Sequence, residues 1–185
     1  MGDPQAVGRN TLTWSIIEGG FGIGWIEWGI ANQSATAWIA ARVLGAVIGL
    51  VIIARAIRLR RAPSANPGPA EPSMFAALGY RLVVAAEVLA LVAGSIVLLL
   101  ANRAEFQIVW VAFVVGVHFV IFGRLFAARF YSLGLGLLVA ALAGLLVGIG
   151  GAGTGPTQAL TGLIAGACMF AMAARMLLRY RLQPA

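Results

Sequence analysis

The stretch LGYRLVVAAEVLALVAGSIVLLL, residues 78–100, carries only two charged side chains, Arg81 and Glu87, and it decides the fold class. About 20 consecutive apolar residues are enough to cross the hydrocarbon core of a bilayer. This stretch is long enough, and the span that we predict around it covers residues 75–101. Four other runs meet the same condition, and they cover residues 36–56, 106–125, 130–150 and 157–178.

The composition excludes an ordinary water-soluble domain. Hydrophobic residues make up 61% of the chain and charged residues 10%, and the mean hydropathy is +0.95. Soluble domains have about 25% charged residues, and a soluble fold of this length cannot hide so much apolar surface. The net charge of +7 does not indicate a nucleic-acid partner, because the arginines lie at the ends of apolar runs. We therefore predict an all-α, polytopic membrane helix bundle that contacts the lipid bilayer.

Residues 12–31 form a weaker sixth run, which Glu18 and Glu27 interrupt. An interfacial helix gathers its charges on one polar face, but these two glutamates point to nearly opposite sides of a helix. We therefore predict a sixth transmembrane helix, with tryptophans near its ends as interface anchors. The alternative is an interfacial helix, which would leave five spans. All seven prolines lie outside the predicted spans, as expected for uninterrupted helices.

Arginines define the orientation of the predicted bundle. They gather on one side of the membrane, before the Pro-rich linker at 62–73, in the next turn on that side and near the end of the chain: Arg55, Arg58, Arg60, Arg61, Arg124, Arg129, Arg175, Arg179 and Arg181. The positive-inside rule makes this side cytoplasmic. With six spans, both termini are cytoplasmic. We expect the cluster at Arg55, Arg58, Arg60 and Arg61 to contact anionic lipid headgroups.

Ionisable side chains inside the spans mark candidate functional sites, because burying them in hydrocarbon is costly. Depth alone predicts two pairs, Glu27 with Arg42 near the outer side and Glu18 with Arg81 near the cytoplasmic side. Such pairs act as gates or merely fix the register of neighbouring helices, and the sequence leaves both open.

Glu87 is the most unusual of these residues, because it lies near the centre of its span, where its side chain cannot reach water. Its helix face also carries Tyr80, a candidate hydrogen-bond partner. A carboxyl group in this position can load and release a proton. His118, the sole histidine, lies on the next helix and can relay that proton to the cytoplasmic surface. The alternative is that both residues are neutral groups that pack and staple helices.

Metal, cofactor and enzyme functions lack the residues that they require. One histidine and one cysteine cannot form a structural zinc site or bis-histidine haem ligation. The single aspartate, Asp3, lies near the start of the chain, so a buried Ser-His-Asp triad is not available. No zinc-protease or phosphate-binding-loop motif is present. We therefore expect no catalytic residues, no bound metal and no cofactor.

The segment VGVHFVIFGRLFAARFYSLG, residues 115–134, is similar to a Gly-x-His-Phe segment with a basic turn and a Gly-rich helix. This pattern occurs in uncharacterised small bacterial integral-membrane proteins. The resemblance implies a bacterial cytoplasmic-membrane location and implies no particular mechanism.

Two functions remain open from the sequence. One is a small proton-linked transporter or channel, with Glu87 as the proton-binding group and the charge pairs as gates. The other is a non-catalytic scaffold or accessory subunit whose polar residues bind a partner's helices, and the nearly apolar span at 130–150 favours this reading. Glycine pairs at helical spacing, such as Gly162 and Gly166, permit close packing within the chain or in a homodimer.

Overall fold

The computed structural model describes residues 9–31, 33, 36–61 and 77–181. Within these residues every regular element is a helix, which confirms the predicted all-α class. The predicted linker at 62–73 lies outside the described residues. The elements are α1 (Arg9–Gly29), α2 (Thr36–Arg61), α3 (Leu78–Leu100), the short 3₁₀ helix η3 (Ala104–Phe106), α4 (Gln107–Leu125), α5 (Arg129–Ile149) and α6 (Thr154–Arg181).

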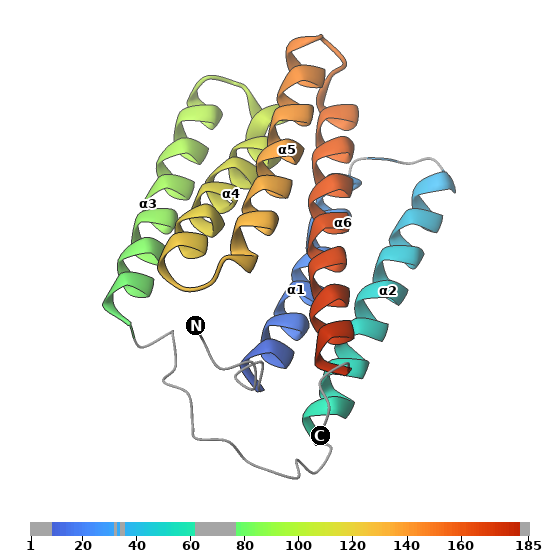
Figure 1. Ribbon diagram of the computed structural model, residues 1–185. Helices are drawn as coiled ribbons and strands as arrows, with labels where there is room; N and C mark the ends of the chain where they lie inside the picture. The colour runs from blue at the N-terminus through green and yellow to red at the C-terminus, as the bar shows by residue number, and fades with distance from the viewer. Residues whose placement is uncertain (1–8, 32, 34–35, 62–76, 182–185) are drawn as a thin grey trace.

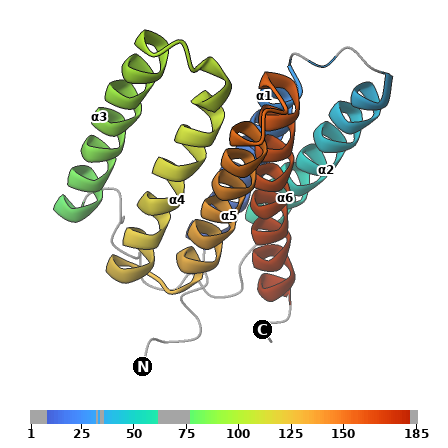
Figure 2. The same ribbon diagram turned by 90° about the horizontal axis from the view of Figure 1, so that it is seen from above.

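The helices stand side by side and alternate in direction, as Figure 1 shows. Consecutive helices are neighbours from α3 to α6, and α1 packs against both α2 and α6. In the view of Figure 2, α3 and α2 lie at opposite ends of the row. One end of the bundle therefore carries the starts of α1, α3 and α5 and the ends of α2, α4 and α6 (Figure 1). We call it the arginine-rich end.

Five of the described helices, α2 to α6, are long and apolar enough to cross a membrane. They form a multi-pass membrane protein. The α1 helix is less apolar, but its 21 residues give it a length of about 31 Å. It runs through the bundle between α2 and α6 rather than across one end (Figure 1).

The α1 helix is held by close contact with the backbone of α6. A Cβ atom added to Gly162 would lie 2.5 Å from the carbonyl oxygen of Trp25 and 2.6 Å from the Cα of Gly29. One at Gly166 would lie 2.9 Å from the carbonyl oxygen of Gly22. The predicted close packing at Gly162 and Gly166 is therefore confirmed within the chain, where small residues let two helices approach closely.

Two details of the sequence interpretation are wrong. Trp14 and Trp25 are 6% and 5% exposed and pack in the core, so they are not interface anchors. Trp14 packs edge-on against Phe130 of α5, with ring centroids 5.3 Å apart, and both tryptophans belong to the core cluster, so protein surrounds them where lipid was expected. Pro156 lies inside α6 rather than before it. It belongs to the first turn, where a missing backbone N–H breaks no helical hydrogen bond.

The α3 helix is peripheral, because none of its residues is buried. It packs mainly against α4. Its outer face carries large exposed apolar side chains, including Leu82, Leu89 and Val92. These side chains have hydrocarbon as their natural solvent in a membrane. The α3 helix is therefore the least anchored of the five apolar helices.

We expect Gly162→Ala to destabilise the bundle by about 1–3 kcal/mol, because the added methyl group meets backbone that cannot move aside. Thermal unfolding in neutral detergent, followed by tryptophan fluorescence, measures the effect. The matched control is Gly24→Ala in α1, where an added Cβ meets nothing within 4 Å. This control should be neutral or slightly stabilising. Equal unfolding temperatures for the two variants would contradict the α1–α6 contact.

Candidate functional site

The structure brings Glu87 of α3 and His118 of α4 together in the middle of their helices. Oε2 of Glu87 lies 2.9 Å from Nδ1 of His118. The side chains are 17% and 8% exposed, so both are largely withdrawn from the surface. An ion pair forms here when the imidazole is protonated and the carboxyl is ionised, and the surrounding low dielectric strengthens their attraction.

The two groups touch without the alignment of a hydrogen bond, since Nδ1 of His118 has no hydrogen-bond partner of good geometry. The imidazole is seated among aromatic rings, with its centroid 4.0 Å from that of Phe122 and 5.2 Å from that of Phe119. Packing therefore fixes the ring in place. The carboxyl group on α3 approaches a histidine that α4 already holds.

Further contacts join α3 and α4 on either side of the pair, and we call the whole set the α3–α4 seam. Toward the arginine-rich end, Tyr80 stacks on Phe122 with centroids 5.3 Å apart. Toward the other end, Nε1 of Trp110 donates a hydrogen bond of 3.1 Å to the carbonyl oxygen of Ala90. Gln107 and Ser95 form a side-chain hydrogen bond near that end. Each contact lies on a different turn, so the seam runs along most of α3.

A groove of about 390 Å³ lies along the seam. Among the described residues that line it, only Glu87 and His118 are ionisable, and the others are apolar or aromatic. Phe113, Val117 and Ile121 line it and are also exposed on the outer surface of α4. The groove thus connects the buried pair with the surface that faces hydrocarbon.

The structure also brings Glu27 and Arg42 together. Nε of Arg42 lies 3.5 Å from Oε2 of Glu27, and Nη2 donates a hydrogen bond of 3.0 Å to the carbonyl oxygen of Ile30. The side chains are 38% and 43% exposed. This pair joins α1 to α2, away from the arginine-rich end (Figure 1).

The predicted pair of Glu18 and Arg81 is not present, and this prediction is corrected. Glu18 is 1% exposed on α1, whereas Arg81 is exposed on α3. Equal depth does not make two helices neighbours, and α3 packs against α4 rather than α1. The cation whose charge acts on Glu18 is Arg129 of α5. Both carboxyl oxygens of Glu18 lack a hydrogen-bond partner among the described residues.

The remaining candidates fall outside the seam. Arg55, Arg58, Arg60 and Arg61 are exposed in the last turns of α2, at the arginine-rich end. Among the described residues, no group of three His, Cys, Asp or Glu side chains is placed to hold a metal.

Sequence reasoning missed Trp110 and Gln107. Their helix was predicted, but nothing in the sequence alone shows that they face Ala90 and Ser95. Only the structure shows that the Trp110 ring occupies the space that a side chain at Gly94 would need.

We expect Glu87→Gln to change the imidazole NMR signals of His118 at fixed neutral pH, because an amide replaces the carboxyl group beside the imidazole. His118 is the sole histidine, so isotope-labelled histidine in a chain without a histidine tag gives one unambiguous probe. The matched control is Glu105→Gln. Glu105 pairs with Arg103 at 3.3 Å in η3, away from the seam. The same signals in both variants and the native chain would show that Glu87 and His118 do not touch.

Comparisons with known proteins give no relative from which an activity can be carried over. No protein-family model matches the chain, and no curated protein or solved structure is significantly similar to it.

Proposed function

We propose that this protein is a small proton-linked transporter or channel whose proton site is the Glu87–His118 pair. The observation that carries the proposal is the distance of 2.9 Å between the carboxyl and the imidazole, at mid-helix on two apolar spans. A carboxyl and an imidazole at this distance are close enough to pass a proton from one to the other. Ionisable groups at such depth commonly belong to proton pathways.

The lining of the groove beside the pair limits how polar a coupled substrate can be. In the part of the chain that the structure describes, its walls offer only Glu87 and His118 as ionisable groups, and its other lining is apolar or aromatic. A strongly polar solute would lose its hydration there without replacement. A lipid-soluble molecule entering from the hydrocarbon, or the proton alone, suits this lining.

This proposal gives no gating role to the other two predicted charge pairs. Glu18 and Arg81 are not together, so they form no gate. Glu27 and Arg42 join α1 to α2, and α2 lies at the opposite end of the row from the seam (Figure 2). Their role in this proposal is to hold that half of the bundle in register.

For orientation, we propose that the arginine-rich end faces the cytoplasm of a bacterial cell and that α1 is a sixth span. The supporting features are the arginines at that end and the path of α1 between α2 and α6 (Figure 1). Both chain termini are then cytoplasmic.

The second candidate function is a membrane scaffold or accessory subunit, and the exposure of α3 favours it. The absence of any buried residue on α3 leaves a long apolar face that a partner's helix can cover. Gentle detergent extraction followed by mass spectrometry distinguishes the candidates. A stable stoichiometric partner that leaves when α3 surface residues such as Leu89 are replaced by tryptophan favours the scaffold.

We expect the purified native chain in proteoliposomes to pass protons under an imposed potential and pH gradient. Glu87→Gln should abolish this flux, because an amide cannot take up a proton at neutral pH. A pH-sensitive dye inside the vesicles provides the measurement.

The matched control is Glu27→Gln, which removes an intramembrane carboxyl of another pair and should retain most of the flux. Equal flux in Glu87→Gln and the native chain would exclude Glu87 as the proton site. No flux in the native chain would exclude a proton channel and leave only strictly coupled transport or the scaffold.

A further inference from the structure

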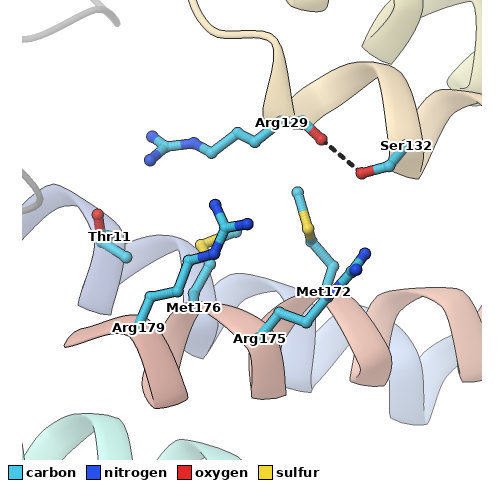
Figure 3. A pocket seen from close by; sticks show the side chains of 7 residues that line it. All are labelled: Thr11, Arg129, Ser132, Met172, Arg175, Met176 and Arg179. Carbon is cyan, nitrogen blue, oxygen red and sulfur yellow. Dashed lines mark hydrogen bonds between the residues drawn. The ribbon is translucent and has the colours of Figure 1, made fainter. Parts of the chain in front are cut away.

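A second cavity lies at the arginine-rich end, between α1, α5 and α6. Its volume is about 140 Å³, and three arginines line it: Arg129 of α5, and Arg175 and Arg179 of α6. Thr11, Ser132 and two buried methionines of α6 complete the lining. Figure 3 shows Arg129 of α5 and Arg179 of α6 extending into the space between their helices, whereas the side chain of Arg175 extends away from Arg179, past Met172.

The charges around this cavity are unbalanced. Within the described part of the chain, no acidic residue lines the cavity, and no carboxylate lies within ion-pair distance of Arg175 or Arg179. The charge of Glu18 interacts with Arg129. The positive charges of Arg175 and Arg179 are therefore the ones that no described carboxylate at the cavity balances.

Membrane topology explains arginines at this end of the bundle, but it does not explain why three of them line one cavity. Arginines that only anchor a helix end extend separately toward headgroups and water. Here Arg129 from α5 and Arg175 and Arg179 from α6 share a cavity lining. Guanidinium groups suit phosphate oxygens, because each offers planar pairs of charged donors.

We propose that this cavity binds a phosphate-bearing anion. A water molecule in the liquid occupies about 30 Å³, so the cavity holds the volume of roughly four or five waters, and a phosphate group has five heavy atoms. Arg175 and Arg179 supply charged donors. The cavity adjoins the N-terminus of α5 at Arg129, where the helix dipole also favours an anion.

Two sources can supply the phosphate. The cavity lies at one end of the bundle, the level at which lipid headgroups meet the helices, so an anionic phospholipid can place its phosphate there. A soluble phosphate or phosphate monoester can reach the same site from the aqueous side. The chemistry of recognition is shared, and an experiment with two arms separates the sources.

The experiment uses the full chain in neutral detergent at fixed ionic strength. One arm adds phosphatidic acid or phosphatidylglycerol, with phosphatidylcholine as the zwitterionic comparison, and counts bound lipid by native mass spectrometry. The other arm adds inorganic phosphate or glycerol phosphate and follows thermal stabilisation against matched chloride. Binding in the first arm alone identifies a lipid headgroup, and binding in both identifies a soluble phosphate as a competent ligand.

The decisive variant is Arg175→Gln with Arg179→Gln, and the matched control is Arg58→Gln with Arg60→Gln. Each double variant removes two exposed arginines from the same end of the bundle. We expect the first to lower affinity about tenfold or more, since hydrogen bonds from charged guanidinium groups are stronger than neutral ones. The control should change it less than about twofold, reflecting only general charge attraction.

A further variant, Arg175→Lys with Arg179→Lys, keeps both positive charges. It shows whether a loss of binding in the glutamine variant comes from misfolding. It should bind more weakly than the native chain and more tightly than the glutamine variant, because lysine lacks the planar fork. If the two glutamine double variants lost affinity equally, net charge alone would explain the binding, and the proposal would be overturned. Failure of the native chain to bind any phosphate-bearing probe would overturn it as well.

Discussion

The close approach of α1 and α6 is the constraint on which the bundle depends. In lipid there is little hydrophobic force to hold helices together, so association relies on tight van der Waals contact and polar seams. Gly162 and Gly29 supply the first, because side chains at either position would meet the facing backbone. Buried Thr11, Ser15 and Thr161 supply small polar residues on the same two helices. With α1 held against α6, α2 packs mainly against α1, and α5 packs against α6.

The α3 helix is attached in a different way, and this places the candidate proton site in context. Its own small residue, Gly94, lies against the Trp110 ring instead of a facing backbone. The seam therefore consists of separate side-chain contacts along α4, and Glu87 with His118 is the one between ionisable groups. The same contact both positions α3 and forms the candidate proton site.

The sequence predicts the spans well and their lateral neighbours poorly, for a physical reason. Hydrophobic length and loop charge indicate how deep each residue lies in the membrane. They therefore suffice to predict the helices and the pairing of Glu27 with Arg42, which lie on consecutive helices. Glu87 and His118 also lie on consecutive helices, at nearly the same depth when counted from their turn. Glu18 and Arg81 lie on α1 and α3, which are not neighbours in the bundle. The depth of a residue does not show which helices are neighbours. The arginine cavity needs the side-by-side placement of α5 and α6, which no periodicity reveals.

The two candidate sites lie in parts of the bundle with different mechanical character. The arginine cavity is built on α1, α5 and α6, and the packing of α6 against α1 and α5 fixes the backbone positions from which its arginines extend. The Glu87–His118 pair joins the least buried helix to a firmly packed one. Elements with few buried contacts open at the lowest free-energy cost. A change of charge at the pair therefore acts first on α3, because its other attachments to α4 are few and the α4 side is held by aromatic packing.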